Sequence, residues 1–233
     1  MTGPRAEILA WWQEGEQTLR GAVDALPDAD LAGPSLLSGW TRQILVAHLA
    51  GNADAMINLL TWARSGVETP MYASADARDE GIEQAAALSP AELRAEFAAS
   101  QARLATAIEQ LPESAWDAEV RTPEGRPVPV SDVPWMRARE TWVHGVDLAG
   151  RVTFADIPAD LASALITNIV RGWQDRDEVS GVAFAATDTG QRWAHGARDI
   201  SATQADLLAW MTGRGSADAI QFNGPPWVPP PWL

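Results

Sequence analysis

Four long segments in the first part of the chain repeat apolar side chains every three or four positions, the spacing of an amphipathic helix. The first covers residues 4–26, the second begins after Thr41, the third runs from Ser89 to Pro112, and the fourth ends at Gly150. Helices with one apolar stripe must bury that stripe against one another. The pattern therefore predicts an antiparallel four-helix bundle.

Local signals support the starts of these helices. Thr41 is a suitable N-cap, and Ser89 with Glu92 forms a capping box with proline at the first helical position. Ser131 or Asp132 is expected to cap the fourth helix. A short acidic helix is expected at about 76–88. The segment between Pro112 and Pro134 is expected to be irregular, with a turn at 123–126 marked by Pro-Glu-Gly-Arg.

The pattern changes after Gly150. We predict a helix over 157–174, a strand from Val179, a second strand through Trp193, a helix from Ser201 to Thr212 and a third strand at 220–222. The predicted organisation is thus a helical bundle over residues 1–150 followed by a small α+β domain over residues 151–233. The last nine residues are too rich in proline for helix or sheet, and their two tryptophans favour packing on a surface.

Two of the apolar helix faces carry polar side chains. Glu140 and His144 lie four residues apart and share their face with Met136 and Val143, while His48 lies in the middle of the apolar face of the second helix. Buried carboxylates and imidazoles need partners. One reading is structural, with a Glu–His hydrogen bond and a core histidine bonded to a carbonyl. The other is a three-ligand metal site of the kind that holds zinc with one open position, or iron(II).

The composition excludes several kinds of partner. The formal net charge of −14 argues against nucleic acid and anionic membranes, which both require a basic surface. The chain has no cysteine, so it cannot supply a thiol or a disulfide. We expect no signal peptide and no apolar run of membrane-spanning length, and hence a cytoplasmic protein.

Several motifs resemble those of the mycothiol-dependent maleylpyruvate isomerase family, part of the wider group of DinB-like four-helix metalloproteins. The likeness covers nearly the whole chain in the same order. It rests on Gly-Trp-Thr at 39–41 leading to Ala-His-Leu at 47–49, Leu-Leu-Thr-Trp-Ala-Arg at 59–64, Thr-Pro-Met-Tyr at 69–72, Trp-Met-Arg-x-Arg-Glu-x-x-x-His-x-x-Asp-Leu at 135–148, and Asp-Leu-Leu-Ala-Trp at 206–210 before Gly-Arg at 213–214.

The resemblance implies a DinB-like bundle that carries zinc, a C-terminal α/β domain and mycothiol as thiol cofactor. The zinc ligands of the family fall on His48, Glu140 and His144, and Arg214 is the nearest match to an arginine that the family uses near its active site. The implied activity is cis–trans isomerisation of a maleylpyruvate-like unsaturated keto acid, or transfer of the mycothiol sulfur. Residues that bind the thiol are not identified.

The residues agree with an external thiol as cofactor, because a chain without cysteine and with an open zinc position is well suited to one, and zinc can ionise a thiol at neutral pH. Arg137 and Arg139 could bind a substrate carboxylate, or form a solvated helix face. Asp147 is either a partner of a metal ligand or a charge at the helix end. We expect small-molecule partners, a thiol and an anionic unsaturated acid, and a monomer or weak homodimer. A DinB-like metal-dependent hydrolase and a non-catalytic metal-binding bundle remain alternatives.

Overall fold

The computed structural model describes residues 4–232, and the chain divides into two compact units, Met1–Val152 and Thr153–Leu233. Parts of the predictions fall on residues 1–3 and on residue 233, which lie outside the described residues. The first unit is helical, and the second combines helices with a small sheet, so the predicted fold class is confirmed.

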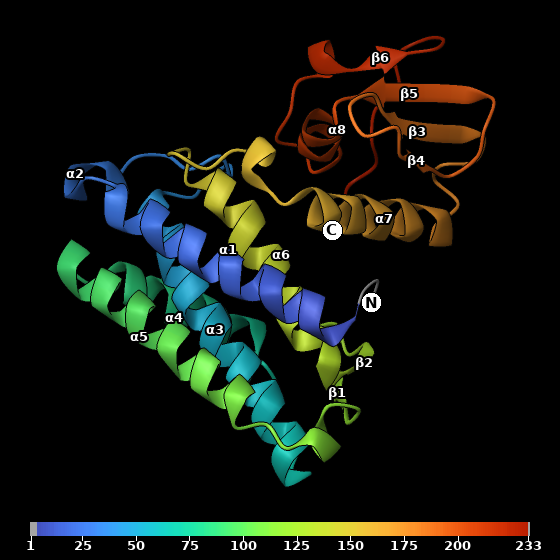
Figure 1. The fold of residues 1–233 in the computed structure, drawn as a ribbon. Coiled ribbons are helices and arrows are strands. Elements are labelled where there is room, and N and C mark those ends of the chain that lie inside the picture. Colours follow the sequence, from blue (N-terminus) through green and yellow to red (C-terminus); the bar gives the residue numbers. More distant parts are fainter. Residues whose placement is uncertain (1–3, 233) are drawn as a thin grey trace. The chain divides into compact units, whose positions relative to one another are not determined.

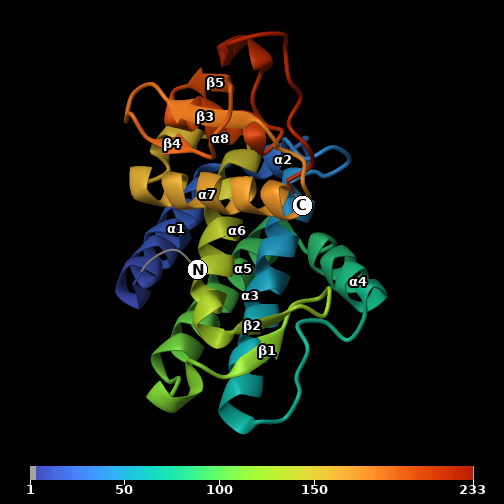
Figure 2. The same ribbon diagram turned by 90° about the vertical axis from the view of Figure 1, so that its right-hand side faces the viewer.

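Four long helices build the first unit (Figure 1). They are α1 (Arg5–Ala25), α3 (Arg42–Ser65), α5 (Pro90–Glu109) and α6 (Val133–Asp147). The short helices α2 (Asp28–Leu31) and α4 (Ala75–Ala86) lie in the connections, and α4 packs on α3 (Figure 2). The core consists of the inward apolar faces of the long helices, with large buried side chains such as Trp142, Phe97, Leu19, Leu45 and Leu59.

Three of the predicted helix starts can be compared with the caps. The Thr41 side chain accepts a hydrogen bond from the backbone N–H of Ile44, and both halves of the Ser89–Glu92 capping box are present. The expectation for the fourth helix was wrong. Asp132 stands at the N-cap position of α6 but its side chain makes no capping hydrogen bond.

The bundle consists of two pairs of helices that run in opposite directions. The start of α3 lies beside the end of α6, because the Arg42 Nε donates to the Leu148 carbonyl at 2.6 Å. It also lies beside the start of α5, since the Gln43 amide donates to the carbonyls of Ala86 and Leu88. Thus α3 and α5 run together, and α6 runs against them. The end of α1 lies beside the start of α5, where the Arg94 guanidinium donates to the Leu26 carbonyl at 2.6 Å, so α1 runs with α6.

Helix α3 is the most apolar helix of the bundle core. It is long and apolar enough to cross a membrane by length and composition, with a mean hydropathy of 1.3 over its most apolar window, which corrects the expectation that no run reaches that length. However, 67% of that window is buried inside the protein, as befits the core helix of a bundle.

The segment before α6 is more regular than predicted. Strands β1 (Glu119–Arg121) and β2 (Pro127–Pro129) pair antiparallel on either side of the turn that the sequence indicated at 123–126. Val120 and Val128 face each other and are buried, while their neighbours are exposed. Three-residue strands containing proline carry too short an alternation to be recognised from sequence.

The second unit contains α7 (Ala159–Asp175), α8 (Gln204–Met211) and a four-stranded sheet in the order β4-β3-β5-β6. The strands are β3 (Val182–Ala186), β4 (Arg192–Trp193), β5 (Arg198–Ala202) and β6 (Gln221–Phe222). Strand β5 pairs parallel with β3 and antiparallel with β6. The helix predicted from Ser201 to Thr212 is present as α8 but begins later, because Ser201 and Ala202 end the missed strand β5 and Thr203 caps α8.

The proline-rich tail packs on the second unit. The Trp227 ring lies 5.8 Å from Trp173, 5.7 Å from Phe184 and 5.7 Å from Trp210, measured between ring centroids. The Trp173 indole also donates a hydrogen bond to the Pro231 carbonyl at 3.2 Å. The tail therefore completes the aromatic core of this small unit.

Candidate metal centre

Three potential metal ligands meet between α3 and α6. The Nε2 atoms of His48 and His144 lie 3.2 Å and 3.3 Å from the same oxygen, Glu140 Oε2. One ligand atom from each of the three residues lies within 4.8 Å of the other two. The two imidazole rings are 5.3 Å apart and nearly perpendicular. Residues 92 positions apart in the sequence are thus brought together.

Helical geometry explains this convergence. On α6 the i,i+4 spacing stacks Glu140 and His144 on one face. On α3, His48 lies in the second turn after the Thr41 cap, and it is surrounded by buried apolar residues. Because α3 and α6 run in opposite directions, the start of one helix faces the end of the other, and the three side chains share one layer.

Asp147 contacts the ring nitrogen of His144 that does not face Glu140. Its Oδ2 lies 2.8 Å from Nδ1 of His144, and the carboxylate is fully buried, with 0% exposure. A proton on Nδ1 is therefore held toward Asp147, and Nε2, the atom directed at Glu140, is the one that a metal would bind. Metal-binding histidines characteristically have such an outer carboxylate. Of the two readings of Asp147, the geometry favours the partner of a ligand.

The electrostatics of the cluster keep it charged. Burial opposes ionisation of Glu140, but hydrogen bonds from His144 and His48 outweigh it and hold the pKa of Glu140 well below its usual value. Burial also lowers the pKa of His144, yet its contacts with Asp147 and Glu140 raise the net pKa to about 9. For His48, burial dominates and lowers the pKa. Without a metal, the positive charge of protonated His144 therefore offsets part of the negative charge of Glu140 and Asp147.

The donor set fits a divalent metal better than a purely structural cluster. His48 is only 7% exposed, and its Nε2 lies 3.2 Å from Glu140 Oε2. Buried imidazoles and carboxylates need partners, and a divalent metal would be a partner for all three side chains at once. Among residues 4–232 the cluster has three members, whereas closed structural zinc sites have four protein ligands. Two imidazoles and a carboxylate are a ligand set that a divalent metal can take.

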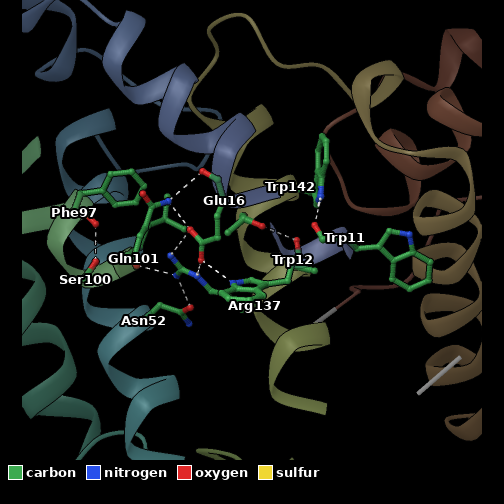
Figure 3. A network of polar contacts seen from close by, with 12 residues as sticks. Trp11, Trp12, Glu16, Asn52, Phe97, Ser100, Gln101, Arg137 and Trp142 are labelled. Carbon is green, nitrogen blue, oxygen red and sulfur yellow. Dashed lines mark hydrogen bonds and ion pairs between the residues drawn. The ribbon is translucent and has the colours of Figure 1, made fainter. Parts of the chain in front are cut away.

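Arg137, predicted to contact substrate, belongs to a different network (Figure 3). Its side chain has 0% exposure, and its Nε donates to Glu16 at 2.7 Å. Its Nη1 donates to the Leu49 carbonyl and to Asn52 Oδ1, both at 2.8 Å. With its donors directed to buried protein groups, Arg137 has no access to a substrate, and it instead ties α6 to α1 and α3. The prediction for Arg137 is corrected accordingly.

The two other predicted arginines are placed differently. Arg139 lies next to the cluster, with its Nη2 3.7 Å from Glu140 Oε1 and a side chain that is 20% exposed. Arg214 belongs to the second unit, just after α8, where its Nη1 donates to the Thr212 carbonyl at 2.6 Å. Its guanidinium lies 6.0 Å from the centre of the Trp232 ring. A contact of either arginine with substrate remains a prediction.

Sequence reasoning missed a cavity of ≈ 320 Å³ beside the cluster. His48 forms part of its wall together with Tyr72 and Arg78, which come from the loop before α4 and from α4 itself. The signal for Tyr72 was its place in the Thr-Pro-Met-Tyr motif at 69–72. Arg78 had no comparable signal, because it lies in a short acidic helix that reads as a solvated surface.

Comparisons with known proteins agree with this geometry. Residues 3–149 match the family model described as the mycothiol maleylpyruvate isomerase N-terminal domain. The crystal structure of the mycothiol-dependent maleylpyruvate isomerase matches with a TM-score of 0.91 and 36% identity, covering 99% of this chain and 98% of that one. A histidine-to-alanine mutant of that enzyme matches equally well.

Two further matches are more distant. YfiT from Bacillus subtilis is described as a probable metal-dependent hydrolase with an unusual four-helix bundle topology. It matches with a TM-score of 0.52 and 16% identity, covering 64% of this chain and 86% of that chain. At this identity the likeness concerns the fold alone. An uncharacterized protein of Mycobacterium tuberculosis is 28% identical over 137 residues. That match covers 56% of this chain and 51% of the relative, so the chain spans about half the length of the curated relatives it matches.

Proposed function

Because the chain belongs to the mycothiol maleylpyruvate isomerase family, we propose that it is a zinc-dependent enzyme that uses mycothiol to convert a maleylpyruvate-like cis unsaturated keto acid into its trans isomer. The observation that carries the proposal is the three-ligand cluster of His48, Glu140 and His144 in a chain that has no cysteine of its own. The composition favours the cytoplasm as its location.

Each residue of the cluster has a defined task in this proposal. His48, Glu140 and His144 hold the metal, and Asp147 keeps the proton of His144 on Nδ1 so that Nε2 remains available. A zinc ion bound there would act as a Lewis acid that lowers the pKa of a thiol brought to its open position. The buried Glu140, ionised at neutral pH, compensates part of the positive charge.

The chemistry balances without an oxidant or reductant. Mycothiol would supply a thiolate that adds to the double-bond carbon β to the ketone, forming a carbon–sulfur bond and moving the π electrons onto the carbonyl oxygen as an enolate. The former double bond is now single and can rotate. Re-formation of the carbonyl expels the thiolate and restores the double bond in the trans geometry. Sulfur transfer, which ends at the adduct after protonation of the enolate, is the related reaction that the same site would support.

A direct assay tests the proposed function. Zinc-loaded protein is mixed with maleylpyruvate, with and without mycothiol, and isomerisation is followed by absorbance. We expect turnover that requires both zinc and the thiol. Hydrolysis of a substrate without any thiol, or an absence of thiol-dependent turnover across a panel of unsaturated keto acids, would contradict the proposal.

A further inference from the structure

The cavity beside His48 lies entirely within the first unit. It measures ≈ 320 Å³, near the lower end of the range of about 300–1,000 Å³ that is usual for small-molecule sites. Helix α3 contributes His48 and Asn58 to its wall, the following loop contributes Tyr72, and α4 contributes Arg78. A potential metal ligand, a phenol and a guanidinium thus face one small space.

The net charge of this wall depends on Arg78. Two carboxylates also border the cavity, Asp54 and Glu96, and both pair with the single guanidinium of Arg103, at 2.8 Å and 2.6 Å, so Arg78 offsets the negative charge that remains. Arg78 forms an ion pair with its neighbour Asp79 at 2.7 Å. Asp79 is 65% exposed, so water weakens this pair and an entering carboxylate can compete with it.

Arg78 lies beside Tyr72 in the cavity wall. Its guanidinium is 5.9 Å from the centre of the Tyr72 ring. Arg78 is half-buried, so an ion pair made there is less screened than one on the open surface. A planar guanidinium in this position can bind a carboxylate through two parallel hydrogen bonds.

The Tyr72 hydroxyl hydrogen-bonds with Arg78 and with the buried Asn52. Burial raises the pKa of Tyr72, partly offset by the charge of Arg78 and by hydrogen bonding with Arg78 and Asn52, so its hydroxyl stays protonated at neutral pH. Asn52 is itself fixed by Arg137, whose Nη1 donates to it at 2.8 Å. The buried network therefore reaches the cavity wall and positions a neutral hydrogen-bond donor there.

We propose that this cavity is the substrate subsite, in which Arg78 binds a carboxylate group of the unsaturated acid and the Tyr72 hydroxyl donates a hydrogen bond to another oxygen of the same molecule. The identity of the acid rests on the proposed function. The placement beside His48 would hold the double bond of a small acid next to the position where the thiol is bound.

Binding of maleate, a small cis dicarboxylate, tests this assignment without turnover. Calorimetric titration is carried out on zinc-loaded wild type and on the variants Arg78→Gln, Arg78→Lys and Tyr72→Phe, after the zinc content of each is measured. We expect Arg78→Gln to weaken maleate binding about 10- to 100-fold at unchanged zinc content, because a charge-assisted pair is lost. Arg78→Lys should recover part of the affinity, and Tyr72→Phe should weaken binding about 2- to 10-fold.

Arg64→Gln is the matched control. Arg64 is an exposed arginine in the last turn of α3 and does not border this cavity. It should bind maleate as the wild type does. Failure of the wild type to bind maleate, or wild-type affinity in Arg78→Gln, would overturn the proposal.

The subsite and the proposed function can fail separately. If maleate binds through Arg78 but no mycothiol-dependent turnover is found, the function is wrong and the subsite stands. If turnover is found and Arg78→Gln leaves both the KM for the acid and maleate binding unchanged, the function stands and the subsite is wrong.

Discussion

His144 and Asp147 form the best-defined contact of the cluster, with Nδ1 2.8 Å from Oδ2 and the carboxylate fully buried. The two residues lie one turn apart at the end of α6, so the helix itself sets their distance. This contact selects the imidazole tautomer whose Nε2 faces Glu140 and His48. In the metal-free protein at neutral pH the ring carries a second proton on Nε2, which a metal would displace.

Removing the negative charge of Asp147 should weaken metal binding without removing any of the three predicted metal ligands. We expect Asp147→Asn to lower zinc affinity about 10-fold or more, since partners of ligating histidines contribute 10- to 100-fold. Competition with a chromophoric chelator measures this. Asp24→Asn, at an exposed position of α1, is the control and should keep wild-type affinity. Equal zinc affinity in Asp147→Asn and Asp24→Asn would show that Asp147 does not support the site.

The raised pKa of His144 should make the metal-free protein less stable at high pH. The pKa is about 9 in the folded protein and 6.5 for an ordinary histidine, so the folded state retains the proton between these values. The stabilisation is present below about pH 6.5 and is lost as the pH rises through about 9. The free energy of unfolding should fall by on the order of 3 kcal/mol more in the wild type than in His144→Gln over this window.

Urea denaturation of the metal-free proteins at pH 6 and pH 9 measures the difference. Parallel pH dependence of wild type and His144→Gln would mean that His144 is not protonated in the folded, metal-free protein.

The Arg137 network should matter for stability, independently of the metal. Arg137→Met leaves the Glu16 carboxylate, 12% exposed, without its cationic partner. Breaking such a buried pair costs about 3–5 kcal/mol. Arg103→Met removes a half-exposed arginine from Asp54 and Glu96 and should cost about 1 kcal/mol or less per pair. Denaturant unfolding of the zinc-loaded proteins compares them, and similar losses in the two variants would contradict a special role for Arg137.

The members of the cluster could be picked out from the sequence because local spacing carries the signal. Glu140 and His144 share an apolar face within one helix, and His48 stands alone among apolar residues of another. Those patterns are visible without knowing how the helices pack. The family resemblance then joined the two helices into one site.

Arg137 shows where such reasoning stops. Arg137 lies one helical turn before Glu140 in the sequence, and this spacing alone suggests a side chain next to the site. Its partner Glu16 is 121 residues away, and only the packing of α1 against α6 shows that the two meet in the core. The cavity bounded by Tyr72 and Arg78 was missed for the same reason. Strand β5 was missed because its short sequence leads directly into a capped helix.

The predicted ligand set can be tested by metal content. We expect about one zinc ion per chain in the purified wild type and nearly none in the double variant His48→Ala with His144→Ala, which leaves one of three ligands. Emission spectrometry on dialysed samples gives the ratio. Wild-type zinc content in the double variant would show that the metal binds elsewhere.

The central claim is that the metal and an external thiol act together, and titration of mycothiol into zinc-loaded and metal-free protein tests it most directly. Calorimetry at several pH values reports both affinity and proton release. The account predicts tight binding to the zinc-loaded protein, with a proton released because the thiol ionises well below its free pKa of about 8.5, and binding at least about 10-fold weaker to the metal-free protein. Equal affinity for the two forms, without proton release, would contradict the account.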